Sequence, residues 1–99
     1  FSGNIQIYDR IADCVHHADI VTTCTPSRNP IIESEWIQAG THINAIGADA
    51  IGKQELALET LQKALVFVDD IEQASHSGEV NVPISEKKLS QTTTNLNLI

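Results

Sequence analysis

The run ADIVTTCT, residues 18–25, constrains the fold more than any other feature of the sequence. It is rich in β-branched residues and almost unbroken, which is typical of a strand buried on both faces of a sheet. Residues 41–46 and 64–70 are predicted as further strands, and the second of them, ALVFVDD, is again apolar and ends on two acids. Such strands belong to parallel sheets that helices cover.

Short helical segments alternate with these strands. Helices are predicted over residues 11–18, 34–39, 54–64 and 71–76. The third carries leucines at 58, 61 and 65, which is the spacing of an amphipathic helix. Residues 4–9 alternate apolar and polar and are predicted as one more strand, whereas the pattern fades beyond Pro83. The sequence therefore predicts an α/β fold with a mostly parallel sheet flanked by helices.

Charge and composition exclude several classes of partner. The formal net charge is −7 over 99 residues. Nucleic acids and anionic membrane surfaces attract basic stretches, so we expect neither as a partner. No apolar stretch approaches the roughly 20 residues of a membrane span. Two cysteines without a visible secretory signal favour reduced thiols in a cytoplasmic protein.

Polar residues gather after the carboxyl end of each predicted strand, which is where parallel sheets bind ligands. The four groups are Asp9-Arg10, Thr25-Pro26-Ser27-Arg28, Gly47-Ala48-Asp49 and Asp69-Asp70. We therefore expect a site along this rim. Asp49 stands between two glycines, at positions 47 and 52. From the residues alone it is either an ordinary turn residue or an acid of that site.

The most specific features of the sequence are GAD-x-x-GKQEL, from residue 47, and HSGE, residues 76–79. With these motifs, residues 18–85 closely resemble the ornithine cyclodeaminase/mu-crystallin family, which also contains archaeal-type alanine dehydrogenases and cyclic-ketimine reductases. The resemblance implies a Rossmann-type dinucleotide domain beside a dimerising substrate domain, and binding of NAD, with NADP as the alternative. It also implies a lyase or oxidoreductase of amino-acid metabolism whose substrate is a small amino acid or a cyclic imine.

The resemblance assigns the catalytic role to Asp49, which matches the family's acid in the G-x-D-x-x-G-K turn. This residue is taken as the general acid/base that moves a proton at the substrate amine while hydride passes to or from nicotinamide. Mu-crystallin-like members lack the acid, so Asp49 favours the enzymatic branch. The HSGE segment is expected to shape a loop near the cofactor cleft, and no chemistry is assigned to it.

Cofactor contacts are implied at six positions. These are Asp9, Thr23, Thr25, Ala45, Ile46 and Lys53. Asp9 matches the acid that hydrogen-bonds a ribose 2′-hydroxyl and favours NAD, although the adjacent Arg10 leaves NADP open. Thr23 and Thr25 resemble residues on the adenosine side, and Ala45-Ile46 those on the nicotinamide side. Lys53 is expected to contact cofactor phosphate or ribose.

Plainer interpretations of these residues stay open. Asp9 is equally well a strand-ending acid, and the two threonines are ordinary strand residues by β-propensity. A metal site is not expected, because the adjacent His16 and His17 on a short helix point apart.

Features of the family are also missing from the sequence. It contains no G-x-G-x-x-G/A loop, and the family's substrate-binding Lys and Arg belong to its other domain. We therefore expect residues 1–85 to form a partial dinucleotide-binding domain and residues 86–99 a tail leading to the remainder, with the isolated chain inactive and a poor binder of NAD. The connection between Asp9 and residue 18 is shorter than in the family, through a deletion or through residues absent from the sequence. The alternatives to an enzyme fragment are a non-catalytic mu-crystallin-like binding protein and a fragment that acts only by self-association, whereas the intact protein is expected to be a homodimer.

Overall fold

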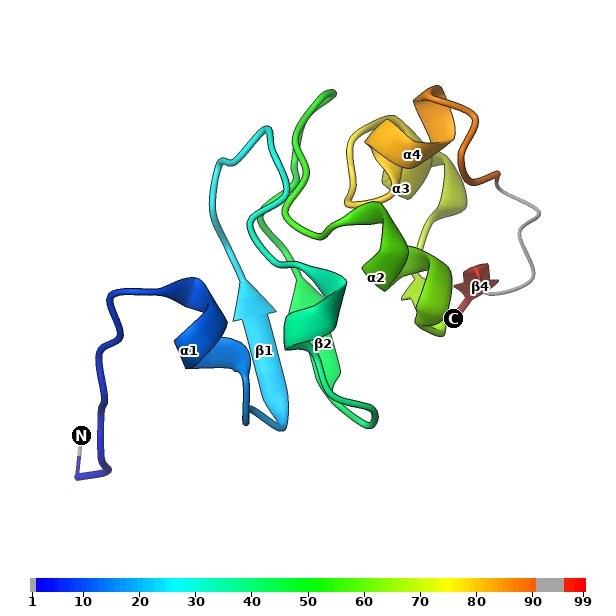
Figure 1. Ribbon diagram of the computed structural model, residues 1–99. Helices are drawn as coiled ribbons and strands as arrows, with labels where there is room; N and C mark the ends of the chain where they lie inside the picture. The colour runs from blue at the N-terminus through cyan, green and yellow to red at the C-terminus, as the bar shows by residue number, and fades with distance from the viewer. Residues whose placement is uncertain (1, 91–95) are drawn as a thin grey trace.

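The computed structural model describes residues 2–90 and 96–99. Its elements alternate strands with short helices, as Figure 1 shows. In chain order they are α1 (Ile11–Val15), β1 (Ile20–Thr23), the 3₁₀ helix η1 (Ser34–Trp36), β2 (His42–Ala45), α2 (Leu58–Lys63), β3 (Val66–Val68), α3 (Ile71–His76), α4 (Asn81–Ser85) and β4 (Leu96–Leu98). In the described part of the chain, none of the helices has the length and apolar character to cross a membrane.

The strands form two parallel pairs. In the first pair β1 lies beside β2, with Thr23 opposite Ala45 at the carboxyl ends. In the second, β3 lies beside β4. Among the described residues, an isolated parallel bridge also joins Ile32, between β1 and β2, to Leu56, between β2 and β3. All described strand pairs are parallel, so the predicted α/β class with a mostly parallel sheet is confirmed.

A small apolar core lies among these elements. Its buried members are Val15, Val21, Ile32, Leu56, Leu61, Ala74 and Val80. Four of them come from α1, β1, α2 and α3, one from each, and the other three come from the segments between the elements. Figure 1 shows α1 on one side of the β1–β2 pair and α2, α3, α4 and β4 grouped on the other.

Two expectations about strands are wrong in this structure. In β1 the burial alternates, so Val21 and Thr23 are buried while Ile20 is 66% exposed. The strand is buried on one face instead of both, because no described element covers the second face. Residues 4–9 form no strand, and the whole segment is exposed. A strand needs a hydrogen-bonding neighbour, and this segment runs away from the rest of the chain (Figure 1).

Helix boundaries differ from the sequence prediction where backbone groups find other partners. The helix predicted from residue 54 begins at Leu58. Residues 55–57 instead pair with the segment around Ile32, since the Glu55 carbonyl accepts from the amides of Ile31 and Ile32 and the Ala57 amide donates to the Ile32 carbonyl. The helix α4 includes Pro83, which is tolerated in a first turn because the amides there have no intrahelical partner.

Candidate functional site

The parallel pairing of β1 and β2 brings their carboxyl ends to one rim. The Thr23 carbonyl accepts hydrogen bonds from the amides of Ile46 (2.9 Å) and Gly47 (3.1 Å), so the chain after β2 stays beside the chain after β1. The two loops that leave this rim then touch again, where the Gln54 amide donates to the Ser27 carbonyl at 3.0 Å. Most of the predicted site residues therefore converge on this rim.

Asp49 lies at the exposed tip of the loop after β2. Its side chain is 73% exposed, and the Lys53 Nζ donates to its Oδ1 at 2.6 Å. The hydrogen bond and the positive charge of Lys53 together lower the pKa of Asp49 below its ordinary value. Asp49 is therefore a carboxylate at neutral pH, accessible to solvent, with a cation beside it.

Gly47, the first residue of this loop, sits where a side chain does not fit. A Cβ built there would overlap the Thr25 carbonyl oxygen and lie 2.5 Å from both Thr25 N and Glu55 Oε1. Gly52, at the other end, has φ +86°, a conformation that glycine adopts without strain. The two glycines of the motif thus serve different purposes, a close approach and a left-handed turn.

Behind the loop lies a buried carboxylate, that of Glu55, whose exposed fraction is 0%. It accepts three hydrogen bonds of 2.8 Å, from the amide and hydroxyl of Thr25 and from the amide of Gly47. Burial alone would raise the pKa of Glu55, but the donors at Thr25 and Gly47 outweigh it and lower the pKa. A charged side chain thus ties the end of β1 to the end of β2.

A second buried carboxylate, Glu79, supports the same segment. It accepts from the amides of Glu55 (2.9 Å to Oε1) and Leu56 (2.7 Å). Burial, and the charge of Glu55 nearby, raise the pKa of Glu79 to about 7 although these amides oppose the rise. Its neighbour Asn81 accepts from the Gly52 amide at 2.9 Å and donates to the Lys53 carbonyl at 2.7 Å.

The residues predicted to contact the cofactor differ in how exposed they are. Ile46 is 64% exposed and Lys53 is half-buried, so both have surface at the rim. Thr23 is buried, and the amide and hydroxyl of Thr25 are engaged by Glu55. Ala45 packs against the core.

Asp9 stands apart from this group. It lies in the exposed segment before α1, and the described residues give its side chain no hydrogen bond to the rim. The structure brings Asp49 and Lys53 together with Ile46 and does not bring Asp9 to them.

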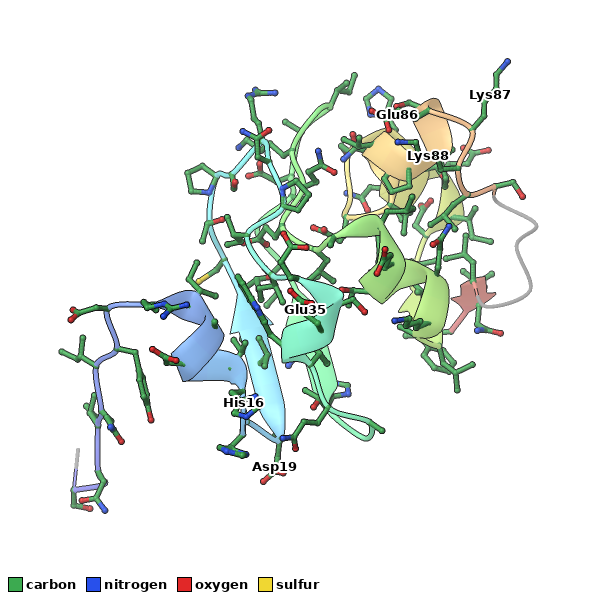
Figure 2. All side chains as sticks on the ribbon, viewed as in Figure 1. His16, Asp19, Glu35, Glu86, Lys87 and Lys88 are labelled. Carbon is green, nitrogen blue, oxygen red and sulfur yellow. The ribbon has the colours of Figure 1, made fainter. Side chains whose placement is uncertain are left out.

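Other polar groups lie elsewhere. Figure 2 shows His16 and Asp19 at the amino-terminal end of β1, the edge opposite the rim. Over residues 2–90 and 96–99 no three His, Cys, Asp or Glu side chains are grouped to hold a metal. An open groove lined by Glu33, Ser34, Glu35, Ala57, Leu58 and Glu59 is acidic, which disfavours an anionic dinucleotide there.

The sequence alone assigned no role to the buried residues Glu55 and Asn81, and to Glu79 only a part in shaping a loop, as the last residue of HSGE. Their donors and acceptors are more than twenty residues away in several cases, so no local pattern shows the contacts. The signal in the sequence was their position in or near the two motifs. Glu55 lies within GKQEL, Glu79 is the last residue of HSGE, and Asn81 follows two residues later.

Comparison with known proteins gives consistent matches along the chain. The profile of the Ornithine cyclodeaminase/mu-crystallin family matches residues 1–97. Alanine dehydrogenase of Archaeoglobus fulgidus is 51% identical over 85 residues, which are 86% of this chain and 25% of that protein. Ketimine reductase mu-crystallin of Mus musculus is 35% identical over 79 residues, 79% of this chain and 25% of that protein.

Solved structures agree. An archaeal alanine dehydrogenase dimer with bound NAD superposes with a TM-score of 0.76 at 51% identity, covering 80% of this chain and 25% of that one. The Delta(1)-pyrroline-2-carboxylate reductase of Thermococcus litoralis, in complex with NADH and L-proline, gives 0.73 at 23% identity and covers 91% and 28%. The incomplete Rossmann-like fold is thereby confirmed. The chain spans about a quarter of the length of these relatives.

Proposed function

Because this chain belongs to the ornithine cyclodeaminase/mu-crystallin family, we propose that it is part of the dinucleotide-binding domain of an NAD(P)-dependent enzyme acting on a small amino acid or cyclic imine. The reaction class is hydride transfer, in deamination or in imine reduction. The observation that carries the proposal is an accessible carboxylate, Asp49, at the carboxyl-end rim of a parallel strand pair.

The residues at the rim suit the nicotinamide half of a dinucleotide. Ile46 offers exposed apolar surface to a flat ring, and Lys53 offers a cation to a ribose or phosphate oxygen. NAD, when bound, supplies the acceptor or donor of hydride. The match to an NAD-bound alanine dehydrogenase at 51% identity supports NAD as the cofactor, with NADP as the alternative.

Contacts on the adenosine side are proposed for Thr23 and Thr25, and a contact with a ribose hydroxyl for Asp9. Ala45 is proposed on the nicotinamide side, next to Ile46. Thr25 would contribute its carbonyl or methyl, because Glu55 already binds its amide and hydroxyl. Asp9 would accept from a ribose hydroxyl only if the segment before α1 approached the rim in the intact domain.

Asp49 would act as general acid/base at the substrate nitrogen. An ionised carboxylate can take a proton from an ammonium or amine in the oxidative direction and return it to nitrogen in the reductive direction. The lowered pKa of Asp49 keeps the side chain ionised at neutral pH, where its negative charge can attract a cationic amino acid. The loop is held at Gly47 by Glu55 and at Gly52 by Asn81, which restricts the positions from which Asp49 can deliver that proton.

Residues 1–85 are proposed as the partial dinucleotide-binding domain, and residues 86–99 as the segment that leads out of it. Within that segment, β4 pairs with β3, so the chain adds a strand to the second strand pair before it leaves the domain. The substrate domain, a homodimeric assembly and a cytoplasmic location are proposed for the intact protein. The alanine dehydrogenase match is described as a dimer, which supports the assembly.

The test uses the full-length protein that carries this chain. Asp49→Asn should lower NAD-linked turnover of small amino acids and imines by about 100-fold or more, in line with loss of a general acid/base. The Kd of NADH, measured by its fluorescence, should stay within about twofold. Asp19→Asn, an exposed acid at the opposite edge, serves as the control and should leave turnover unchanged. Retained turnover in Asp49→Asn would reject the assignment.

Two other functions are alternatives. A non-catalytic mu-crystallin-like binding protein would bind NADH and show no turnover even without a substitution. The presence of Asp49 argues against this alternative, as does the mouse relative, which is named as a ketimine reductase. Self-association alone is favoured by exposed apolar side chains on the second strand pair, namely Leu65, Phe67, Leu98 and Ile99. Light scattering that shows a monomer at high concentration would reject it.

A further inference from the structure

The loop that carries Asp49 is held by side chains from other segments at several points. At its start, Glu55 accepts from the Gly47 amide at 2.8 Å. Near its tip, Arg28 Nη1 donates to the Ile51 carbonyl at 3.1 Å. At its end, Asn81 binds both Gly52 and Lys53. Asp49 itself, among the described side chains, is hydrogen-bonded to that of Lys53.

Asn81 is the most buried of the side chains that bind the end of the loop, with 3% exposed. Its Oδ1 accepts from the Gly52 amide at 2.9 Å, and its Nδ2 donates to the carbonyls of Lys53 and Gly78, each at 2.7 Å. One primary amide therefore meets an N–H and two C=O groups at once. A carboxylate of the same size would keep the acceptor and lose both donors.

These contacts determine where Lys53 stands, and Lys53 in turn determines the state of Asp49. The Lys53 backbone is held by Asn81 through its carbonyl, and its side chain reaches Asp49 at 2.6 Å. The turn is closed by the Lys53 amide, which donates to the Ala50 carbonyl at 3.1 Å. Asn81 is the one described side chain that binds the backbone on both sides of the Gly52–Lys53 peptide.

We propose that Asn81 is a positioning residue for Asp49: it fixes the Gly52–Lys53 peptide and thereby the Asp49–Lys53 pair at the rim. Glu79, two residues earlier, holds the next part of the same segment through the amides of Glu55 and Leu56. The segment 79–81 thus acts as a support for the catalytic loop. This inference rests on the proposed function, since it gives Asp49 its role.

A positioned acid is worth more than a mobile one, because displacing a catalytic group by about 1 Å can cost roughly 100-fold in rate. In Asn81→Ala the Gly52 amide and the Lys53 carbonyl lose their partner, and the turn can rotate. The Asp49–Lys53 pair then loosens, and the pKa of Asp49 returns upward towards its ordinary value. A fall in kcat and a shift of the acidic limb of the pH profile should therefore occur together.

The experiment measures kcat, the Kd of NADH, the thermal midpoint and the pH profile of kcat/KM in the full-length protein. Asn81→Ala should lower kcat between about 10- and 100-fold, leave the Kd of NADH within about twofold, and move the acidic limb to higher pH. Hydrogen exchange at the Gly52 amide should become faster. Asn81→Ser leaves a short neutral hydroxyl that can partner one of these backbone groups and should show an intermediate kcat; it also replaces Asn81→Ala if the latter does not fold. Gln38→Ala, an exposed amide at the opposite edge of β2, is the control.

The inference would be overturned if the acidic limb of the pH profile stayed in place in both Asn81 variants. It would also be overturned if kcat and NADH affinity fell only in proportion to the fraction of protein that is folded. Asp49→Asn, measured in parallel, separates this failure from failure of the proposed function. If Asp49→Asn abolishes turnover while the Asn81 variants behave as wild type, only the positioning role is rejected. If Asp49→Asn retains turnover, the proposed function is rejected, and the positioning role with it.

Discussion

The carboxylate of Glu55 accepts a hydrogen bond from the backbone amide of Gly47 at 2.8 Å. The same carboxylate and the Thr25 backbone occupy the space that a Cβ at Gly47 would need. The residue that begins the loop carrying Asp49 is thus packed directly on the buried charge that joins the two strand ends. The sequence motif GAD-x-x-GKQEL encloses both residues, so its first glycine and its glutamate form one structural unit. Part of the motif's specificity therefore serves to build the rim, while the side chain of Asp49 is exposed and that of Lys53 is partly so.

Gly47→Ala should destabilise the protein through overlap, by about 1–3 kcal/mol or more, as overpacking of a filled site does. Gly3→Ala is the control: Gly3 is exposed and its φ is not positive, so alanine there should change stability by about 0.5 kcal/mol or less. Urea unfolding of the chain, followed by Trp36 fluorescence, compares the two. A Gly47→Ala variant as stable as the wild type would show that the strand ends can separate freely.

Glu55→Gln should lower the free energy of unfolding by about 2–3 kcal/mol at pH 7, because a charged acceptor of three hydrogen bonds is replaced by an amide with one acceptor oxygen. The NH₂ group of the substituted side chain would also point at one of these donors, with which it cannot form a hydrogen bond. The pKa of Glu55 is lowered on folding, so its contribution is present above the ordinary value of 4.5 and is lost as the pH falls through the folded-state pKa.

The difference between wild type and Glu55→Gln should therefore shrink in acid. Glu59→Gln, an exposed glutamate at the start of α2, controls for charge and should change stability by about 0.5 kcal/mol or less. Equal effects of the two substitutions at pH 7 would contradict the structural role given to Glu55.

Much of the fold was predictable because it depends on local periodicity. The strands around Val21, Ile43 and Val66 and the helix containing Leu61 all lie within the segments that the sequence predicted. Parallel pairing then places residues 25 and 47 at one rim, so the location of the candidate site also followed from the strand order.

The rest depends on contacts between distant residues. β4 exists because residues 96–98 pair with residues 66–68, which no local pattern indicates. The segment 4–9 has strand-like alternation but no described neighbour to complete its hydrogen bonds. Glu55 looks like an ordinary polar helix residue until its donors at Thr25 and Gly47, thirty and eight residues away, are seen together.

The isolated chain should bind NAD weakly, because its sequence contains no glycine-rich phosphate loop and Asp9 lies apart from the rim. Calorimetry of the 99-residue chain with NAD should detect no binding in the micromolar range. The full-length protein under the same conditions is the control. Micromolar binding by the isolated chain would show that the rim residues alone suffice for the cofactor.

Glu79 should make stability fall as the pH rises from about 4.5 to about 7. Its pKa is raised on folding to about 7, so the stabilisation is fully present below the ordinary value of 4.5 and is lost as the pH passes through the raised value. At roughly 1.4 kcal/mol per pH unit, the loss is on the order of 3 kcal/mol. Glu79→Gln, which keeps a neutral acceptor for the Leu56 amide, should remove this dependence and be more stable than wild type at pH 8. Urea unfolding at pH 5 and pH 8 gives the comparison, and a pH dependence identical in both proteins would assign the effect to another group.

Lys53→Met should raise the pKa of Asp49 towards its ordinary value, because the hydrogen bond and the charge of Lys53 are the main causes of the lowered pKa. The carboxyl carbon of Asp49, followed by NMR through an acid titration, reports this directly. Lys63→Met is the control, since Lys63 donates to the Ser34 hydroxyl at 3.3 Å and lies in α2, outside the loop. Salt should reduce the difference between wild type and Lys53→Met, because both side chains have exposed surface and added ions screen their attraction. An Asp49 titration that is the same with and without Lys53 would mean that the pair seen at 2.6 Å does not persist in solution.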